Sequence, residues 1–528
     1  MDRREFIRLA GASLACAATG MPEVSGQEEC VLGGRSRPNF LIILADDMGF
    51  SDLGCYGSEI RTPHLDGLAS EGLLFTQGYN CARCCPSRAA LLTGLYPHQA
   101  GVGKMVSAPD APERPGPYQG YLNDHCATLA EVLRAAGYRT YMSGKWHVGE
   151  APEHWPRKRG FDRYFGLISG ASSYWELIDQ PDRKRMMAQD DEPFTPEPGE
   201  FYMTDAFSDF AVRCVKEHAG HEDPFLLYLA YTAPHWPLHA WPEDIARHED
   251  AYRIGWEELR RRRYARQRAL GVIDPKWPLS PLDEEVPPWE AVEDKPYWER
   301  LMAVYAAMID RMDHGIGRVL RALEETGAAE NTIVVFLSDN GGCAEDIAGR
   351  KLHTPGTRAG ERGSYDAYKR PWANASNTPF RLYKKWIHEG GIATPFLMRW
   401  PRGIAQPGGM THQVAHIIDI MPTCLDAAGV AYPETFDERP VLPVEGRSLL
   451  PILRGETREP HPALFWEHFG NRGVRAGDWK YVAAANGDWE LYNLAEDRTE
   501  LRDLGGTAPE KARELHALYE AWAQRVGV

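Results

Sequence analysis

The sequence predicts an α/β fold: a large domain with a mostly parallel mixed sheet flanked by helices, and a small α+β C-terminal domain with an antiparallel sheet. Two observations support this prediction. Through most of the chain, apolar runs of strand length alternate with amphipathic helical segments, which is typical of a parallel sheet. After Pro460 the pattern changes to short strands at hairpin spacing and one closing helix. A chain of 528 residues is also too long for one simple core.

The elements of the large domain follow from its hydrophobic pattern. Residues 39–45 form a continuous apolar run that ends in Asp46-Asp47. Such a run predicts a buried parallel strand whose carboxyl end carries a site. Further strands are predicted at 73–79, 139–143, 225–231 and 332–337, and helices at 65–72, 87–92, 129–137, 204–218 and 297–325.

Two segments interrupt this alternation. Residues 257–267 are rich in arginine, and we expect a solvated helix there rather than a nucleic-acid patch. Residues 345–378 are long, polar and aromatic, with Gly and Pro throughout, which is typical of a functional loop or a disordered segment.

The C-terminal region has a different period. Strands are predicted at 463–468, 473–475, 479–483 and 489–492, and a helix at 509–526. We therefore divide the chain into residues 1–36, a catalytic domain at 37–458, and a C-terminal sheet and helix at 459–528.

Residues 1–36 are interpreted as an export signal and polar linker. Arg3-Arg4-Glu5-Phe6-Ile7-Arg8 resembles a twin-arginine motif, and the apolar run at 9–18 is far shorter than the ~20 residues that span a membrane. We predict that the twin-arginine machinery exports the protein to the periplasm. A basic disordered tail is the alternative. Residues 13–16 resemble a lipoprotein cleavage box, although Ser13 stands where such a box usually has Leu. A lipid anchor at Cys16 is therefore an open alternative.

Charge limits the partners of this chain. The formal net charge of −16 argues against nucleic acid and against long-range attraction of an anionic substrate. Any anion must then be captured by a local positive pocket. The chain has ten cysteines, whose spacing does not fix a pairing, and an export route permits disulfides without requiring them.

The most informative motif is Cys84-Cys85-Pro86-Ser87-Arg88, followed by Leu92-Thr93-Gly94. With Cys81 it also reads C-x-x-C, which indicates a redox pair or half of a zinc site, and a buried Cys turn before a helix is a third interpretation. A zinc site needs about four ligands, and no second cluster follows. C-x-P-S-R followed by L-T-G resembles the signature of the type I sulfatases, members of the alkaline phosphatase superfamily.

This resemblance implies an alkaline phosphatase-like fold and a modified nucleophile. In the family the cysteine corresponding to Cys84 is oxidised to Cα-formylglycine, whose hydrated aldehyde attacks sulfur. The implied partner is a formylglycine-generating or anaerobic sulfatase-maturating enzyme.

Two strand ends offer oxygen ligands. Asp46-Asp47 follows the first strand, and Asp339-Asn340-Gly341 follows the strand after the long helix. Each pair is commonly a cap or a turn. Together they can cup one hard cation, and three carboxylates with an amide oxygen suit Ca²⁺ better than zinc. The resemblance makes these four residues, with the oxygen at position 84, the calcium ligands.

Cationic candidates form a second group. Arg88 lies one helical turn after Cys84; Lys145 and His147 follow the strand at 139, and His235 follows the strand at 225. Lys384 precedes Glu389-Gly390-Gly391 by the family spacing, with Lys385 beside it. A lone His or Lys is usually a surface or core residue; four in family order favour a site.

The resemblance also implies a role for each residue. Arg88 orients the nucleophile, Lys145 and Lys384 stabilise the sulfate oxygens, His235 protonates the leaving alcohol, and His147 removes the proton that expels sulfate. With Ca²⁺ the pocket would carry about +2, inside a protein of −16.

The substrate is less defined. Residues 169–174 and 372–380 are expected to line the leaving-group side, with Ser173 and Trp372 as substrate contacts beside Lys145, His235 and Lys384. We favour a sulfated glycan, with aryl sulfates as surrogates. A phosphodiesterase or phosphonate monoester hydrolase on the same scaffold and an inactive glycan-binding relative remain as alternatives. The complete set of Cys84, histidines and metal ligands argues against the inactive relative.

Overall fold

The computed structural model describes residues 37–112, 114–179 and 183–528. The predicted export signal, with Arg3-Arg4 and Cys16, lies outside these residues. Residues Arg37–Val528 form one compact unit, and the boundary at 458/459 stays a prediction. Among the described helices, none combines the length and apolarity that a membrane crossing requires.

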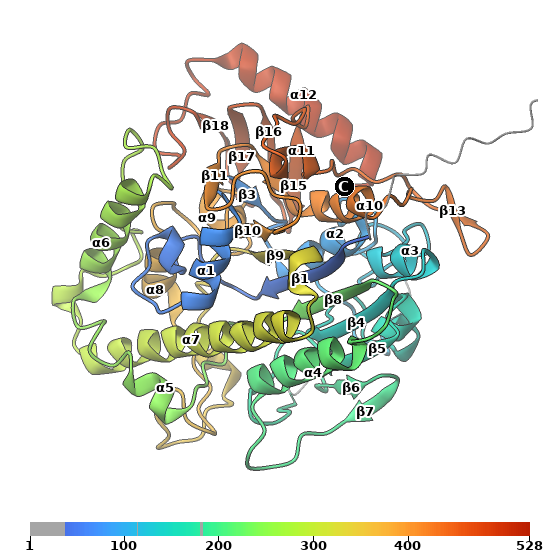
Figure 1. The fold of residues 1–528 in the computed structure, drawn as a ribbon. Helices are drawn as coiled ribbons and strands as arrows, with labels where there is room; N and C mark the ends of the chain where they lie inside the picture. Colours follow the sequence, from blue (N-terminus) through green and yellow to red (C-terminus); the bar gives the residue numbers. More distant parts are fainter. Residues whose placement is uncertain (1–36, 113, 180–182) are drawn as a thin grey trace, which may run out of the picture. The chain divides into compact units, whose positions relative to one another are not determined.

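The main sheet has the strand order β11-β2-β10-β9-β1-β8-β4-β5-β6-β7 within the described part of the chain (Figure 1). Its central strands β9, β1, β8, β4 and β5 are parallel, and one strand on either side of them, β10 and β6, runs antiparallel. The predicted mostly parallel mixed sheet is therefore confirmed. The strands are β1 (Asn39–Ala45), β2 (Leu73–Phe75), β4 (Arg139–Gly144), β5 (Arg163–Leu167), β6 (Met187–Gln189), β7 (Glu192–Phe194), β8 (Phe225–Ala230), β9 (Thr332–Ser338), β10 (Phe396–Arg399) and β11 (Gly409–Thr411).

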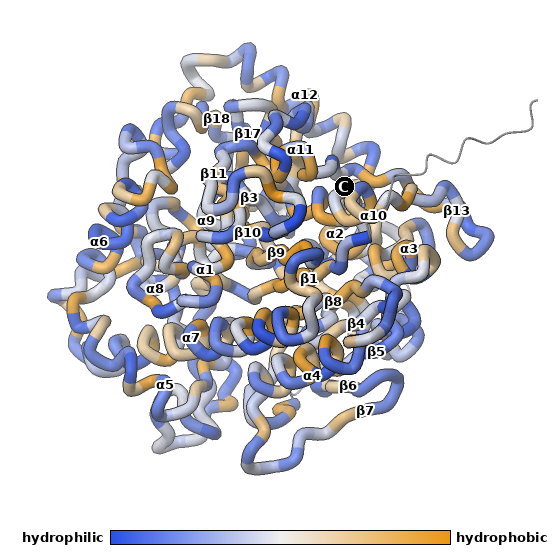
Figure 2. Tube along the Cα trace, in the orientation of Figure 1, coloured by the Kyte–Doolittle hydropathy of each residue, from blue (hydrophilic) through white to orange (hydrophobic). Residues whose placement is uncertain are grey.

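The register of the central strands brings their carboxyl ends to one edge. Ala45 at the end of β1 pairs with Ser338 at the end of β9, and Gly144 at the end of β4 pairs with Ala230 at the end of β8. β1, β8 and β9 are buried along nearly their whole length, and hydrophobic residues are frequent in the tube around them in Figure 2. Side chains that follow β1, β4, β8 and β9 consequently gather at one place.

Helices cover the sheet in two groups. In Figure 1, the long α7 (Lys295–Glu325) packs against both α1 (Pro63–Glu71) and α4 (Met203–His218). A second group forms around α2 (Cys84–Thr93), which contacts α3 (Leu129–Ala135) and α10 (Ile420–Ala428). The remaining helices are α5 (Pro242–Ala246), α6 (Gly255–Leu270), α8 (Lys369–Ser376), α9 (Glu389–Ile392) and α11 (Leu450–Leu453).

The C-terminal region forms the predicted antiparallel sheet. Its strand order is β15-β16-β17-β18, and α12 (Pro509–Val526) packs along it (Figure 1). The strands are β15 (Leu464–His468), β16 (Asn471–Ala476), β17 (Trp479–Ala483) and β18 (Trp489–Asn493).

The predicted strand at 73–79 is wrong as a single element. It divides into β2 and β3 (Gly78–Tyr79), and β3 pairs with β12 (Ala415–His416) in a separate small sheet. Gly78 lies so close to Phe396 that a Cβ on residue 78 would approach the Phe396 Cβ to 2.5 Å. The absence of a side chain at Gly78 therefore lets the backbone pass close to β10 as it leaves the main sheet for β3. Two-residue strands β13 (Thr435–Phe436) and β14 (Arg439–Pro440) form a further hairpin.

The prediction of a helix in the arginine-rich segment is confirmed, but the prediction that this helix is solvated is wrong. In α6, Arg263 is buried, and its guanidinium lies 2.6 Å from Asp52 Oδ1 and 2.8 Å from Glu59 Oε1. Arg261 and Arg262 remain exposed. A charge pattern does not reveal that acidic partners from residues 52–59 fold against one face of the helix. The predicted loop at 345–378 is largely irregular but contains α8.

Candidate active site and metal site

Four strand ends and the first turn of α2 form a buried cluster of polar side chains. Asp46 and Asp47 follow β1, Asp339 and Asn340 follow β9, and Cys84 begins α2. All five side chains are almost inaccessible to solvent. Lys145 and His147 after β4, His235 after β8, Arg88 on α2 and Lys384 join them.

Two oxygen atoms of the predicted metal ligands have no hydrogen-bond partner. Asn340 Nδ2 donates to Asp47 Oδ1 at 2.7 Å, and the Asp47 backbone N–H donates to Asp339 Oδ1 at 3.3 Å. Asp46 Oδ1 and Asn340 Oδ1 are buried and accept no hydrogen bond from protein. Buried polar atoms nearly always have partners, and an all-oxygen set of carboxylates and one amide is the donor chemistry of Ca²⁺. The residues present therefore fit a hard divalent cation.

Each carboxylate of the cluster also has a cationic neighbour. Lys145 Nζ lies 2.5 Å from Asp46 Oδ2, Lys384 Nζ lies 2.7 Å from Asp47 Oδ1, and Arg88 donates to Asp339 Oδ2 at 2.9 and 3.1 Å. Burial raises the pKa of Asp46, but Lys145, His235 and Arg88 outweigh it and lower the pKa to about 2. Asp46 is thus an anion at neutral pH.

Asp339 is affected in the opposite direction. Burial and the nearby Asp46 carboxylate raise its pKa well above the usual value, and Arg88 only partly opposes them. Two adjacent buried carboxylates that repel each other are stabilised by additional positive charge, which again fits a cation at this position.

Cys84 occupies the first position of α2, preceded by the extended residue Arg83. Ser87 fixes this turn: its Oγ accepts from the Cys81 backbone N–H at 2.9 Å and donates to the Asp339 carbonyl at 2.5 Å. The neighbouring Cys85 thiol lowers the pKa of Cys84 well below its usual value; burial opposes this, and Lys145 and His147 support it. The position is therefore reactive and electropositive.

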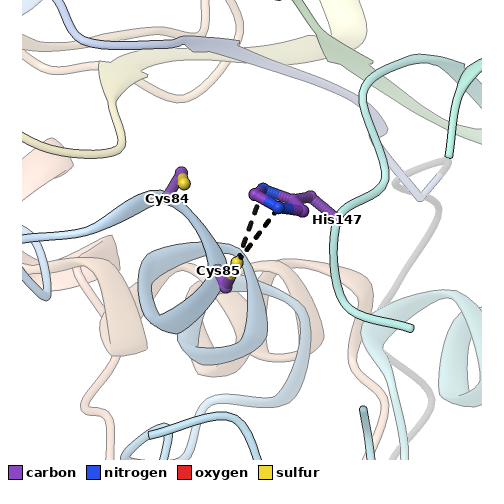
Figure 3. Close-up of side chains that lie close together, drawn as sticks. All are labelled: Cys84, Cys85 and His147. Carbon is purple, nitrogen blue, oxygen red and sulfur yellow. Dashed lines mark hydrogen bonds between the residues drawn. The ribbon is translucent and has the colours of Figure 1, made fainter. Parts of the chain in front are cut away.

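His147 faces both cysteines at the start of α2 (Figure 3). Cys85 Sγ lies 3.4 Å from Nδ1 and 3.4 Å from Nε2 of the ring. Burial lowers the pKa of His147 to about 3, with Lys145 acting in the same direction and Cys84 against it. The imidazole is thus neutral and available to accept a proton.

His235 lies on the other side of the acidic cluster. Its Nδ1 is 2.5 Å from the Trp236 carbonyl, so Nδ1 carries the hydrogen, and Nε2 is 3.5 Å from Asp47 Oδ2. Burial lowers the pKa of His235; Asp47 opposes this and Lys384 adds to it. The Asp47 carboxylate favours the protonated ring that a proton donor requires.

The structure brings together the residues that the sequence proposed for nucleophile, metal and charge: Asp46, Asp47, Cys84, Arg88, Lys145, His147, His235, Asp339, Asn340 and Lys384. Ser173 is buried in its own loop, where its hydroxyl accepts from the Trp175 N–H at 3.2 Å and lies 3.5 Å from His239 Nδ1. Its contact with substrate stays a prediction.

The predicted role of Trp372 is wrong. Its side chain is fully buried on α8, packs edge-on against Trp256 with centroids 5.4 Å apart, and donates Nε1–H to the Trp298 carbonyl at 2.8 Å. An aromatic residue in a polar loop has the same appearance in sequence whether it faces a ligand or enters the core. This one is a core residue.

Glu345 was missed by the sequence analysis. Its carboxylate is 3.0 Å from Arg83 and 3.1 Å from Lys385, and it accepts the Trp236 Nε1–H at 3.1 Å. Burial raises the pKa of Glu345, but Lys384 and Arg83 outweigh it, and the pKa is lowered. Glu345 therefore links the residue before Cys84 to the residue after His235. Its place in the polar loop at 345–378 was the one available indication.

Comparison with known protein families covers almost the whole described chain. The family model described as "Sulfatase" matches residues 38–430, and the model described as "N-sulphoglucosamine sulphohydrolase, C-terminal" matches residues 380–521.

Individual proteins give the same result. The chain is 34% identical to an uncharacterized sulfatase of Schizosaccharomyces pombe over 93% of this chain and 94% of that protein. It is 36% identical to an arylsulfatase of Klebsiella aerogenes over 81% and 95%, respectively. The crystal structure of Ps i-CgsB in complex with k-i-k-neocarrahexaose is similar with a TM-score of 0.68, 25% identity and coverage of 92% and 93%.

Proposed function

The chain belongs to the sulfatase family, and on that premise we propose that it is a glycan sulfatase with a formylglycine at position 84 and a bound calcium ion. As a sulfuric ester hydrolase it splits sulfate esters into an alcohol and sulfate. The single observation that carries the finer proposal is one buried cluster, in which Cys84 lies beside His147, and the acidic side chains and unpartnered oxygens lie beside His235, Lys145, Arg88 and Lys384.

Asp46, Asp47, Asp339 and Asn340, with the oxygen at position 84, would hold the calcium ion. The ion would supply positive charge for the developing negative charge on sulfate oxygens. Cys84 lies in the C-x-P-S-R motif, and its conversion would supply a geminal diol, a nucleophile that no encoded side chain provides. A formylglycine-generating or anaerobic sulfatase-maturating enzyme is the proposed partner for that conversion.

The chain's own residues then have separable tasks. Lys145 and Lys384 stabilise the charge on the sulfate oxygens, and Arg88, fixed by Asp339 and the Lys145 carbonyl, holds the nucleophile turn in place. His235 gives a proton to the leaving alcohol oxygen. His147, neutral and beside position 84, accepts the proton that must leave residue 84 before sulfate is expelled.

Two alternative functions predict a different outcome with sulfate esters. A phosphodiesterase or phosphonate monoester hydrolase would use the same pocket for phosphorus, and an inactive glycan-binding relative would turn over nothing. The named sulfatase relatives favour sulfate. The glycan part of the proposal is supported by the similar structure with a bound neocarrahexaose and by the local positive charge in a chain of −16. Export to the periplasm through the twin-arginine machinery completes the proposal, with lipidation at Cys16 as its variant.

The experiment measures sulfate release from defined sulfated sugars and aryl sulfates, with phosphodiesters and phosphonate esters in parallel. Protein made with a maturation enzyme should release sulfate, and the peptide containing Cys84 should be lighter than the gene predicts. Full activity from protein that carries the unmodified thiol would contradict the formylglycine.

Metal dependence is tested on the same protein. Asp47→Ala should lose calcium and activity together, and chelators should act in the same direction. Stoichiometric zinc in active enzyme would exclude the calcium assignment, whereas Glu514→Gln on exposed α12 should bind calcium normally.

A further inference from the structure

A group of side chains next to His235 has no role in the reaction described above. The ring of Trp236 lies 4.5 Å from the His235 ring, centroid to centroid. The Arg350 guanidinium sits over the Trp236 ring at 4.6 Å from its centroid, and Tyr365 contacts the same indole at 6.3 Å. Trp236 is fixed in turn by its hydrogen bond to Glu345. Arg350 is thus held beside the residue that follows His235, the proposed proton donor to the leaving alcohol.

Arg350 and Arg185 are the two cations of this group without an anionic partner. Neither side chain forms an ion pair or a hydrogen bond with any residue of 37–112, 114–179 or 183–528, and Arg185 Nε is buried without an acceptor. Their neighbours differ: Arg183 pairs with Glu150 at 2.8 Å, and Arg83 pairs with Glu345 at 3.0 Å.

Arg185 is within electrostatic range of Arg350 and of Tyr365, the residue that contacts Trp236. Burial lowers the pKa of Arg185, and Arg183 and Arg350 lower it further, whereas Glu150 and Tyr365 oppose them. Arg185 is partly buried and Arg350 is exposed, and a partly desolvated cation near a like charge is unfavourable unless an anion joins them. In a protein of net charge −16, two such unpaired arginines beside the proton donor indicate a ligand of opposite charge.

We propose that Arg185 and Arg350 form a second anion-binding subsite, which takes an additional acidic group on the same substrate molecule. This inference rests on the proposed glycan sulfatase function and narrows it to polyanionic saccharides. The additional group is a second sulfate or a carboxylate on the alcohol side of the scissile bond. Arg350 is pre-positioned by its cation–π contact with Trp236, which lowers the entropy lost when it binds the anion.

The test compares four substrates: a monosulfated disaccharide, the same disaccharide with a second sulfate, the same disaccharide with a carboxylate, and 4-nitrophenyl sulfate. The wild-type kcat/KM should be about tenfold or more higher for at least one of the two dianionic sugars, mainly through KM. Which of the two is preferred identifies the acidic group. Added salt should reduce this preference.

Arg350→Met and Arg185→Met should each bring the ratio of dianionic to monosulfated kcat/KM close to one. Arg350→Lys should restore part of it. The matched control is Arg261→Met, an exposed arginine of α6 that pairs with Glu258, which should keep the full ratio. Thermal melting of each variant separates a binding defect from a folding defect.

Two results would overturn the subsite: a wild type that does not distinguish the three sugars, or an Arg350→Met variant that loses activity equally on all of them. Failure to release sulfate from any substrate, 4-nitrophenyl sulfate included, would contradict the proposed function itself, and the subsite with it.

Discussion

Among the buried charge clusters of residues 37–112, 114–179 and 183–528, two contrast with each other: one at the strand ends around Asp46, and one where the C-terminal sheet meets β3 and α9. In the second cluster, Glu389 Oε1 lies 2.9 Å from Lys480, and Oε2 lies 2.9 Å from Arg498 and 2.8 Å from the Tyr79 hydroxyl. Lys480 also lies 2.8 Å from Glu500. All of these residues are almost inaccessible to solvent.

The two clusters differ in how completely their carboxylates are used. Both oxygens of Glu389 have cationic or hydroxyl partners, whereas Asp46 Oδ1 and Asn340 Oδ1 have none. Both carboxylates are anionic: burial raises the pKa of Glu389, but Lys480, Arg498 and Arg475 lower it to about 2. Burial and a shifted pKa therefore do not distinguish a reactive site from a structural ion cluster. The oxygen atoms do: Glu500 Oε1 in the second cluster accepts no hydrogen bond but still has Lys480 beside it, whereas Asp46 Oδ1 and Asn340 Oδ1 have neither a hydrogen bond nor an ion pair.

The largest expected effect is a loss of activity, without a loss of stability, when a residue of the first cluster is changed. Cys84→Ala removes the proposed nucleophile, and kcat/KM should fall about 10⁴-fold or more while the melting temperature changes little. Cys85→Ser, one residue further along the same helix, should lose far less sulfate release. An equal loss in both variants would assign the defect to the turn rather than to residue 84.

His235→Ala sharpens the distinction inside the active cluster. A sugar alkoxide needs a proton to leave and a nitrophenolate scarcely does, so kcat/KM for a sulfated sugar should fall by about 10²–10⁴, and far less for 4-nitrophenyl sulfate. His147→Ala should instead slow both substrates wherever release of sulfate from residue 84 limits turnover. If His235→Ala lost kcat/KM equally on both substrates, the role of His235 would be structural rather than that of a proton donor.

The structural cluster should respond in the opposite sense. Glu389→Gln leaves Lys480 and Arg498 without their shared anion, and the free energy of unfolding should fall by about 3–5 kcal/mol. Activity per folded molecule should stay close to wild type. Denaturant unfolding with sulfate release in the same samples checks both parts. Loss of activity without loss of stability would show that the two clusters are coupled.

Acid should progressively remove the stabilisation that the Glu389 carboxylate contributes. The folded-state pKa of Glu389 is about 2 and the unfolded value is about 4.3, so the stabilisation is complete above about pH 4.3 and is lost as the pH falls towards 2. The difference in unfolding free energy between wild type and Glu389→Gln should narrow over that interval. A difference that is independent of pH would indicate a packing effect of the substitution.

The smallest effect belongs to an exposed pair. Lys511 and Glu514 on α12 form an ion pair with solvent-exposed side chains, and Glu514→Gln should change the free energy of unfolding by less than about 1 kcal/mol. A loss comparable to that of Glu389→Gln would mean that burial does not explain the behaviour of the second cluster.

The sequence predicted the first cluster far better than the second. Asp46, His235 and Asp339 each follow a strongly apolar strand, and Lys145 follows a more polar strand of the same alternating pattern, so a parallel sheet alone predicts that they meet. Glu389 and Lys480 carry no such local indication, because their contact depends on how the C-terminal sheet docks. Arg263 and Trp372 were misjudged for the same reason: a side chain's environment comes from distant segments, and polar or aromatic character alone does not show which face is covered.

The deep position of Cys84 would make the proposed conversion of its thiol depend on two competing rates, that of oxidation and that of folding. The residue is only 2% exposed and is enclosed by segments synthesised after it, among them Lys145, His235 and Asp339. An enzyme that oxidises this thiol must hold the surrounding peptide, so we expect it to act before β9 joins β1. Chains that fold first would keep the thiol permanently. The fraction of active protein in a preparation would then record how fast the converting enzyme works relative to folding, and slower folding would raise it.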